Sequence, residues 1–473
     1  MEMAENTHGY GCVIDAGSSG SRVYLYRWLN KPQSLISKYF SHETLPGISD
    51  PINGIPALLD LISLAKSSLV LAGVDVATVP IHLGATAGMR ILSPEVEVSI
   101  MKEIRSLLQT SGFLFRKEWA KTISGEEEGA FGWLVANYLK NNGKLPSRHT
   151  ETSYGAIDLG GASAQISFRP TGAILAHQFP VQVEKTEYSL YTHSFLYYGV
   201  DQAHIHFHSL HLDNYTSASP CYPVGYTDHT TGISGTSRWD DCLVSVASLF
   251  DKTYDCYHGD GKINRCSFNG IYQPPLENKA FIAMSAFVYT WDFLGLRTSS
   301  ETDDLKSLIK RAQHVCKMPY EEQLKWYDDI LREVVVDRRT NNVHQQCFNA
   351  AYAYHLLTTG FGLPVNNTPI EIHGDIDGTQ VQWALGMMLV ERNKGSCELS
   401  GQRGVLQKLN FTSDAINIDY KVVCLSLLPA LMLVICILGY LLHSTRQKYR
   451  LVESYLPISA VSDKDTKTER QMS

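Results

Sequence analysis

The stretch Tyr10–Trp28, YGCVIDAGSSGSRVYLYRW, combines an apolar strand, a turn of glycine and serine, and a second strand in which apolar and polar residues alternate. This alternation is typical of a half-exposed β-hairpin. The same order of features returns in Tyr154–Phe168, YGAIDLGGASAQISF. An internal repeat of this kind predicts two related lobes, each opening with an aspartate and a Gly/Ser turn.

The segments around the two hairpins predict an α/β fold. We expect helices over 55–72, 94–110 and 126–139 and a strand that runs into a turn over 81–90. The second lobe is expected to return to helices near Ala280, Leu305, Glu321 and Cys347, with a last apolar helix over 380–390. We therefore predict an N-terminal lobe over 8–145 and a C-terminal lobe with a Cys-rich insertion over 146–400, whose last helix, about 380–400, is placed to pack back on the first lobe.

Composition excludes several classes of protein. The chain has 473 residues, of which 44% are hydrophobic and 19% charged, so a sizeable core is available and wholesale disorder is excluded. With 41 basic and 48 acidic residues, the net charge of -7 gives no electrostatic footprint for nucleic acid. Any phosphate-bearing ligand must therefore be held locally, by backbone amides and a metal.

The C-terminal part predicts a membrane anchor. Val422–Leu442 contains no charged residue, and at about 1.5 Å per residue it spans the roughly 30 Å hydrocarbon layer. Arg446, Lys448 and Arg450 follow closely, which favours a cytosolic tail over 443–473 and places residues before a linker at 401–421 in the lumen or outside the cell. The alternative is a buried core helix. The opening MEMAENTHGYG carries no apolar signal segment, so either an upstream signal or anchor is missing from this chain or the topology is wrong.

Cysteines and sequons agree with an oxidising compartment. No CxxC pair suggests a zinc site, so we expect disulfides of open connectivity among Cys221, Cys242, Cys256, Cys266, Cys316, Cys347 and Cys397. Glycosylation sequons stand at Asn214, Asn366 and Asn410. A separate group, His204, His206, His208 and His211, lacks an acidic residue at ligand spacing, so we interpret it as a solvated helix face rather than a zinc site.

The two Gly/Ser turns suit a phosphate cleft between the lobes. Consecutive small residues let backbone N–H groups converge on phosphate oxygens. Asp15 and Asp158, at the ends of the first strands, are placed to hold a divalent cation through water, as Mg²⁺ prefers. For one turn alone the alternative is an ordinary hairpin; the pairing of two turns strengthens the phosphate interpretation.

Two further segments extend this site. His82–Leu92, HLGATAGMRIL, delivers a strand into small residues that permit close approach to a ligand, and Thr86 adds a hydroxyl; helix packing is the alternative. Ile123–Trp133, ISGEEEGAFGW, carries Glu126, Glu127 and Glu128. Successive helical residues point about 100° apart, so at most two of the three carboxylates face the cleft, and a solvated helix start is the alternative.

With these motifs in view, the chain resembles the ectonucleoside triphosphate diphosphohydrolases, or apyrases, of the actin, heat-shock and sugar-kinase superfamily. DAGSSGSR, GATAGMR, GEEEGAFGW, DLGGASAQ and QWALG occur in the order of the five apyrase conserved regions, and YTHSFLYYG and NGIYQPP reinforce the likeness. The resemblance covers about Tyr10 to Leu389. It implies two actin-like (ribonuclease-H-like) lobes with a phosphate cleft between them.

The resemblance also implies residue roles. Glu127 looks like the general base that activates water, and Ser163 like the serine that orients it. Asp15 and Asp158 would hold Mg²⁺ or Ca²⁺ through water, with Trp383 near the metal or, equally, in the core. Tyr289 matches the tyrosine that stacks on the base, and Gln346 stands where an aromatic partner is expected. The phosphates would be cradled by Ser18, Ser19, Gly20, Arg22, Thr86, Ala87, Gly160, Gly161 and Ala162.

The implied activity is hydrolysis of nucleoside tri- and diphosphates to the lower phosphate and orthophosphate by in-line attack of water. The alternatives are a nucleotide-switched binding protein of the actin or heat-shock type and an exopolyphosphatase-like phosphatase. The Gln-Cys-Phe string at 346–348, with GSSGSRVY and YQPP, looks more like the Golgi and lysosomal members than the cell-surface ones. Tyr449 and Tyr455 begin tyrosine-x-x-bulky strings of the kind that sorting adaptors bind.

Overall fold

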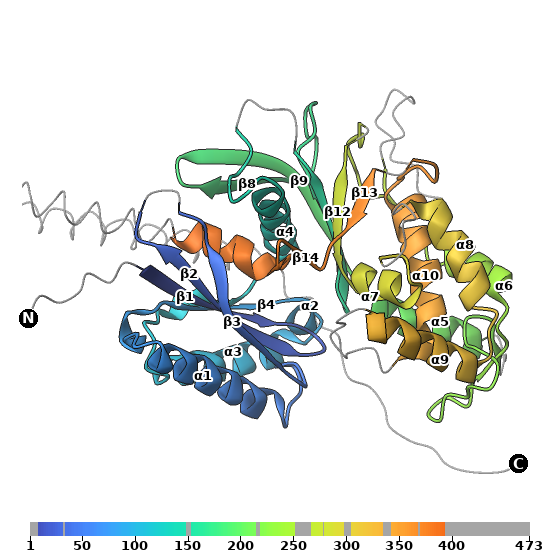
Figure 1. Ribbon diagram of the computed structural model, residues 1–473, viewed down its shortest axis with the longest axis horizontal. Helices are drawn as coiled ribbons and strands as arrows, with labels where there is room; N and C mark the ends of the chain where they lie inside the picture. The colour runs from blue at the N-terminus through green and yellow to red at the C-terminus, as the bar shows by residue number, and fades with distance from the viewer. Residues whose placement is uncertain are drawn as a thin grey trace, which may run out of the picture. The chain divides into compact units, whose positions relative to one another are not determined.

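The computed structural model describes residues 8–31, 34–147, 153–213, 218–250, 266–277, 279–297, 304–333, 342–367 and 369–392, all within one compact unit, Met1–Glu398. Two β-sheets dominate this unit (Figure 1). The predicted span over 422–442, the linker, the tail tyrosines, and Cys256, Cys397, Asn214 and Asn410 lie outside the described residues.

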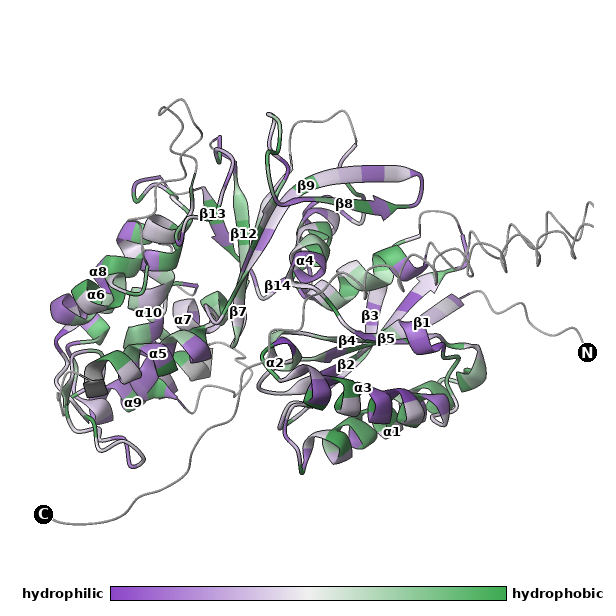
Figure 2. Ribbon diagram, turned by 180° about the vertical axis from the view of Figure 1, so that it is seen from behind, coloured by the Kyte–Doolittle hydropathy of each residue, from purple (hydrophilic) through white to green (hydrophobic). Residues whose placement is uncertain are grey.

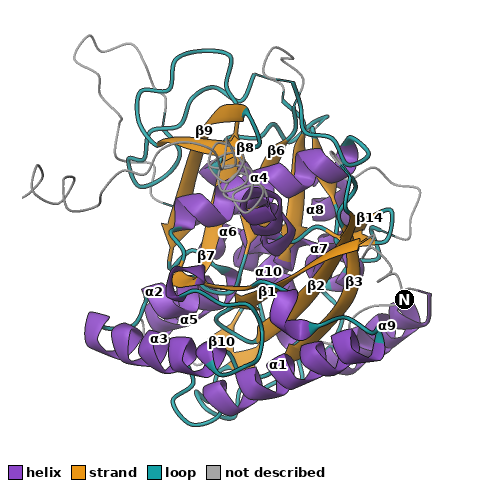
Figure 3. Cartoon of the chain, turned by 90° about the vertical axis from the view of Figure 1, so that its left-hand side faces the viewer, coloured by secondary structure: helices purple, strands orange, loops and turns teal. Residues whose placement is uncertain are grey.

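The N-terminal lobe is a five-stranded sheet covered on one face by helices, with strand order β3-β2-β1-β4-β5. Apolar side chains of α1 and α3, including Leu58, Leu61 and Ile104, pack against Ile14 and Leu25 of the sheet. Figure 3 shows α1 and α3 on the same side of the strands, and Figure 2 shows their mixture of apolar and polar residues. The elements are β1 (His8–Ala16), β2 (Ser21–Leu29), β3 (Ser37–Thr44), α1 (Gly54–Leu71), β4 (Ile81–Ala85), α2 (Ala87–Arg90), α3 (Pro94–Gln109) and β5 (Ala120–Thr122).

The C-terminal lobe is a six-stranded sheet, with strand order β13-β12-β6-β7-β9-β8. Helices α5 to α10 and the sheet share one large apolar core that includes Phe168, Phe281 and Trp291. The sheet strands are β6 (Gly155–Leu159), β7 (Ser163–Phe168), β8 (Gln178–Val183), β9 (Thr186–Leu196), β12 (Phe281–Ser285) and β13 (Ile370–Ile372). The helices are α5 (Val200–Asp213), α6 (Trp239–Ala247), α7 (Ala286–Phe293), α8 (Leu305–Val315), α9 (Tyr320–Glu333) and α10 (Gln346–His355), and the short strands are β10 (Ala218–Ser219), β11 (Ser234–Gly235), β14 (Asp375–Ile376) and β15 (Thr379–Gln380).

The internal repeat predicted from the two hairpins is confirmed by the pairing of the strands. In each lobe the first strand pairs antiparallel with the second, as β1 with β2 and β6 with β7. In each lobe it also pairs in parallel with a later strand, β1 with β4 and β6 with β12. The α/β fold with two related lobes is therefore present. One expectation was wrong in detail: the segment after Ala280 begins as the buried strand β12, and the helix α7 starts only at Ala286.

A central layer joins the two lobes. Helix α4 (Gly125–Lys140) packs on β6, β7 and β9, and its Trp133 is fully buried. Residues 383–392 are helical and share a core with α4 and with Val13 and Tyr24 of the first lobe. Met388 of this last helix lies directly over Gly11. The last helix thus packs back on the first lobe.

Disulfides are present in the C-terminal lobe, as its cysteine content predicts. Cys221 is bonded to Cys242, and Cys316 to Cys347. Among the described helices, α1 is long and apolar enough by composition to cross a membrane. Its inward face, including Leu58 and Leu61, is buried in the core of the N-terminal lobe.

Candidate active site between the two hairpins

The two Gly/Ser turns close in the same way. The Gly17 N–H donates to the Gly20 carbonyl over 2.9 Å, and the Gly160 N–H donates to the Ser163 carbonyl over 3.0 Å. Each turn follows a strand whose last residue but one is an aspartate, Asp15 in β1 and Asp158 in β6. The repeat therefore places equivalent chemistry at the same end of both sheets.

The turns of the two lobes approach each other closely. A Cβ atom added to Gly161 of the second lobe would lie 2.9 Å from the hydroxyl oxygen of Ser18. Within the first lobe, one added to Gly88 would lie 2.6 Å from the Ser18 Cα. A larger residue at either position would push the turns apart. The expected phosphate-binding segments 18–20, 86–87 and 160–162 thus converge around Ser18.

Asp15 and Asp158 form a buried acidic pair. They are 4% and 6% exposed. Burial raises the pKa of Asp15 to about 6, which Arg22 opposes, Asp158 reinforces, and a hydrogen bond from Trp383 opposes. Burial also raises the pKa of Asp158, against a hydrogen bond from Ser285 and the charge of Arg22. The charge of Asp158 thus adds to the effect of burial on the pKa of Asp15.

This pair fits a divalent cation held through water. The Oδ1 atom of Asp158 is buried and has no hydrogen-bond partner among the described residues. Two buried carboxylates, one of which has an oxygen atom without a hydrogen-bond donor, are not fully stabilised by protein groups. A hydrated Mg²⁺ or Ca²⁺ ion would supply both positive charge and hydrogen bonds. Among the described residues no group of three or more His, Cys, Asp and Glu forms a protein-only metal cage. The donor set therefore matches a cation that keeps most of its ligands as water and substrate oxygens.

Trp383 contacts Asp15 and also belongs to the core. Its indole hydrogen-bonds Asp15, and its ring packs over Gly84 and against Phe131. At 3% exposure it is part of the core that joins the lobes. Its hydrogen bond therefore helps to hold Asp15 in place.

The structure does not bring Glu127 into the site. Ser124 caps α4 by accepting a hydrogen bond from the Glu127 N–H, and the Glu127 carboxylate accepts one in return from the Ser124 N–H. Its other carboxylate oxygen pairs with Lys121. This reciprocal capping box turns the side chain back over the helix start. The expectation that Glu127 faces Ser163 is thus corrected.

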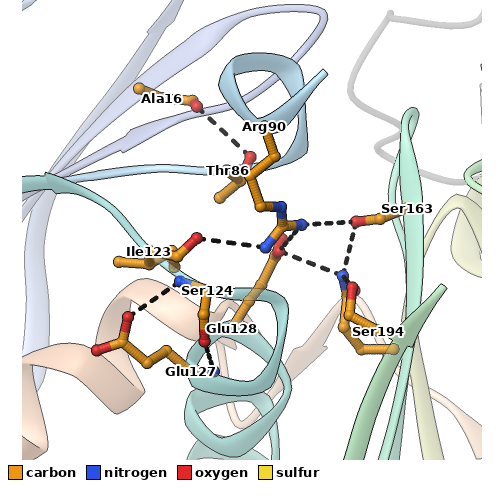
Figure 4. Close-up of polar contacts among 10 residues, drawn as sticks. Ala16, Thr86, Arg90, Ile123, Ser124, Glu127, Glu128, Ser163 and Ser194 are labelled. Atoms are coloured by element: carbon orange, nitrogen blue, oxygen red, sulfur yellow. Dashed lines mark hydrogen bonds and ion pairs between the residues drawn. The ribbon is translucent and has the colours of Figure 1, made fainter. Parts of the chain in front are cut away.

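Glu128 occupies that place instead, in the cluster drawn in Figure 4. Its carboxylate accepts hydrogen bonds from Arg90 over 2.8 Å and from Gln165 over 3.2 Å. The Ser163 hydroxyl lies 3.0 Å from the same Arg90 nitrogen and 2.6 Å from the Gln165 amide. Glu128 and Ser163 are therefore held together by two shared donors.

Burial controls the protonation of Glu128. It raises the pKa of this carboxyl to about 7; Arg90 opposes the shift, and Asp158 and Asp15 add to it. A carboxylate with a pKa near neutrality, beside an oriented hydroxyl, is suited to accept a proton from water. Sequence reasoning included Glu128 among three candidate carboxylates but assigned the base to Glu127, and it missed Arg90 and Gln165, although both lie inside the quoted motifs.

The remaining phosphate-binding candidates differ in their surroundings. Thr86 is 5% exposed and its N–H donates to the Ala16 carbonyl, which ties its turn to β1. Ser19 is exposed. Arg22 forms a 2.8 Å ion pair with Glu43, at the side of Asp15. The positive charge of Arg22 is thus partly neutralised by Glu43.

The two residues expected to bind the base have different surroundings. Tyr289, on α7, is half-buried and interacts electrostatically with Arg22 of the other lobe. Gln346 is only 3% exposed and lies on α10 beside the buried Cys347 and Phe348. Since its side chain is inside the core, Gln346 offers no surface for a base, and that expectation is corrected.

The histidine-rich segment is also corrected in part. His204 and His208 are buried, and their Nε2 atoms lie 3.0 Å apart, one of them donating to the other. Burial lowers the pKa of His204 to about 3, with contributions from His208 and His344. His206 is exposed as expected, and the side chain of His211 lies outside the described part. The pair belongs to the core of the lobe.

Comparison with known proteins identifies the family. The model of the GDA1/CD39 (nucleoside phosphatase) family matches residues 1–402. The chain belongs to this family. It is 31% identical over 433 residues to ectonucleoside triphosphate diphosphohydrolase 1 of Bos taurus, covering 81% of each chain, and 32% identical over 428 residues to ectonucleoside triphosphate diphosphohydrolase 2 of Homo sapiens, covering 80% of this chain and 81% of the relative.

A solved structure supports the same architecture. Nucleoside triphosphate hydrolases from Neospora caninum superpose with a TM-score of 0.60 at 15% identity, covering 82% of this chain and 93% of theirs. At this identity the likeness concerns the fold. The chain is thus an enzyme of the GDA1/CD39 family with the two-lobed actin-like fold.

Proposed function

We propose that this protein hydrolyses nucleoside tri- and diphosphates, releasing orthophosphate, and that Glu128 is the general base. The observation that carries the proposal is the convergence of the Glu128 carboxylate and the Ser163 hydroxyl between the two turns. The relatives named above are triphosphate diphosphohydrolases, which supports the choice of substrate. A bound polyphosphate would lie along the N–H groups of the turns at 17–20 and 160–162.

In this proposal the protein holds water between Ser163 and Glu128. The Ser163 hydroxyl orients the water, and Glu128 accepts its proton as the oxygen attacks the terminal phosphorus. The positive charge of Arg90 favours the ionised form of the Glu128 carboxyl. It also brings the net charge of the Arg90–Glu128 pair close to zero. Asp15 and Asp158 would hold Mg²⁺ or Ca²⁺, which offsets phosphate charge when bound. Backbone N–H groups of the two turns stabilise the charge that develops on the phosphate oxygens.

This function is distinguished from its alternatives by products and substrates. The purified full chain should release orthophosphate from ATP and ADP continuously with Mg²⁺ and lose this activity in EDTA. Ser163→Ala should lower kcat by about 10- to 1,000-fold with little change in KM, because the serine acts on water and not on the nucleotide. A single turnover followed by tight nucleotide retention would favour the switch protein, and a preference for long polyphosphate would favour the exopolyphosphatase.

We also propose that the catalytic unit faces the lumen or the exterior. The two disulfides support an oxidising compartment. Asn366 of the sequon at 366–368 is exposed, as glycan attachment requires. Endomembrane residence is favoured by the tail tyrosines at 449 and 455, and replacing both with alanine should move a tagged full chain to the cell surface.

A further inference from the structure

Two histidines meet at the edge of the C-terminal sheet. His193 lies on β9, and His177 stands immediately before the edge strand β8, which pairs with β9 (Figure 1). Their Nδ1 atoms are 3.3 Å apart, and the centroids of the two rings are separated by 4.3 Å. Among the described residues neither ring has another hydrogen-bond partner. The His177–His193 pair therefore brings two imidazole nitrogens together outside the catalytic cluster.

The backbone fixes the position of His177. This residue has a φ of 59°, in the left-handed region that residues other than glycine seldom adopt. Its carbonyl accepts a 3.1 Å hydrogen bond from the Thr192 N–H, which ties it to β9 next to His193. An unfavourable backbone conformation persists only where the surrounding structure holds it. The meeting of the two rings is thus set by the backbone of both strands.

The surroundings of the pair suit a metal ligand. Both histidines are half-buried, so a small ion can reach them from solvent. The ring of Phe195 lies 4.5 Å from that of His193, centroid to centroid, and restricts its movement. Burial, with a further contribution from His177, lowers the pKa of His193 to about 4. His193 is therefore neutral near pH 7, as an imidazole that binds a metal must be.

The spacing of the two nitrogens fits a single tetrahedral metal ion. Zn–N bonds are about 2.0–2.1 Å long, and two of them at the tetrahedral angle place their nitrogens about 3.3 Å apart. The observed Nδ1–Nδ1 distance is 3.3 Å. The alternative is a hydrogen bond between the rings, and this distance is long for one. Because the described residues contain no group of three or more His, Cys, Asp and Glu that could hold a metal, water would complete the coordination.

We propose that His177 and His193 bind a transition-metal cation such as Zn²⁺ through their Nδ1 atoms, at a site separate from the acidic pair. Imidazole nitrogen suits Zn²⁺, whereas Mg²⁺ and Ca²⁺ prefer oxygen ligands such as those of Asp15 and Asp158. The bound ion links the start of the edge strand β8 to β9. It requires no nucleotide, so this inference is independent of the proposed function.

The test measures Zn²⁺ binding to the full chain by competition with a zinc indicator, in excess Mg²⁺ that occupies the acidic pair. The wild type is expected to bind a Zn²⁺ ion that Mg²⁺ does not displace. His177→Asn and His193→Gln should each raise the Kd for this ion by about 100-fold or more, because a single ring loses the advantage of chelation. Asparagine is chosen at position 177 because it also tolerates the left-handed backbone.

The matched control is His206→Gln, which removes an exposed histidine of the same lobe and should leave the Kd unchanged. With Mg²⁺ in excess, Zn²⁺ should raise the unfolding temperature of the wild type but not that of His177→Asn. Because His177 lies outside the strands, this variant decides the test even if His193→Gln fails to fold. An unchanged Kd in His177→Asn, or equal weakening in His206→Gln, would overturn the proposal. A wild-type chain that binds no Zn²⁺ would also overturn it and leave the contact as a hydrogen bond.

Discussion

The Arg90 guanidinium and the Glu128 carboxylate form a 2.8 Å ion pair at the junction of the two lobes. Arg90 ends the short helix α2 of the N-terminal lobe, and Glu128 lies in the first turn of α4. Both side chains are largely buried, at 15% and 9% exposure. The pair therefore couples the turn at 86–90 to the residue proposed to activate water.

Activity should depend on the ionisation of Glu128. A general base must be unprotonated, and burial raises the pKa of this carboxyl to about 7. We expect kcat/KM to rise with pH through about 7 and then to level off. The groups facing Glu128 are Arg90 from α2, Asp15 and Asp158 from the two first strands, and the uncharged Gln165 and Ser163 of β7.

The same ion pair allows a sharper form of this test. Arg90→Gln removes the cation that favours the carboxylate, so the rising limb should move to higher pH by about one unit or more. This shift is measured by comparing the pH profiles of kcat/KM for ATP with Mg²⁺ between pH 5.5 and 9 in the wild type and the variant. A limb that does not move in Arg90→Gln would show that Glu128 does not determine the profile.

Divalent cations should stabilise the folded protein through Asp15. The two buried carboxylates repel one another, and a bound cation offsets this repulsion. At a cation concentration 100 times its Kd, the free energy of unfolding should increase by about 2.7 kcal/mol. In Asp15→Asn the increment should disappear, while stability in EDTA should equal or exceed that of the wild type because a buried charge is removed. Thermal unfolding with and without Mg²⁺ measures both effects, with the exposed Asp241→Asn as control.

Glycine at position 161 should be required for the two turns to meet. An alanine there would bring its Cβ within 2.9 Å of the Ser18 hydroxyl, and Asp201 crowds the same point. We expect Gly161→Ala to lower kcat/KM by about 10- to 100-fold. Gly172→Ala, at a site with open space around it, is the control. Equal activity of both variants would mean that the turns need not approach this closely.

The disulfide between Cys316 and Cys347 should stabilise the C-terminal lobe. It closes a loop with a sequence separation of 31 residues, for which loop-closure entropy gives about 3–4 kcal/mol. Replacing both cysteines with alanine should lower the free energy of unfolding by this order, measured by denaturant unfolding without reductant. A change below about 1 kcal/mol would assign the bond a minor role.

The fold could be predicted from sequence because the two hairpins repeat the same pattern. Alternation in Tyr10–Trp28 and Tyr154–Phe168 fixed the strands, and the repeated turn placed Asp15 and Asp158 at equivalent strand ends. Both patterns are local in sequence, so they can be recognised without knowledge of tertiary contacts. By contrast, β12 was mistaken for helix because a short, fully buried strand and a buried helix both appear as continuous apolar runs.

The motif alone does not decide whether Glu127 or Glu128 faces the site. The capping-box signature, a serine followed three residues later by glutamate, is present as Ser124 and Glu127 and could have assigned Glu127 to the helix start. The neighbouring Glu128 is then the carboxylate free to turn inward. Arg90 and Gln165 could not be found this way, because their roles depend on contacts between segments distant in sequence. Gln346 was misplaced for the same reason, since its burial follows from the packing of α10.

The most direct measurement compares steady-state phosphate release from ATP by Glu128→Gln and Glu127→Gln, each with Mg²⁺ and with folding checked by thermal unfolding. Glu128→Gln should lower kcat by about 10²- to 10⁴-fold, the usual contribution of a positioned base. Glu127→Gln should stay within about fivefold of the wild type, because it loses only a cap and a partly exposed ion pair. Normal turnover by Glu128→Gln, or a large loss confined to Glu127→Gln, would contradict the account.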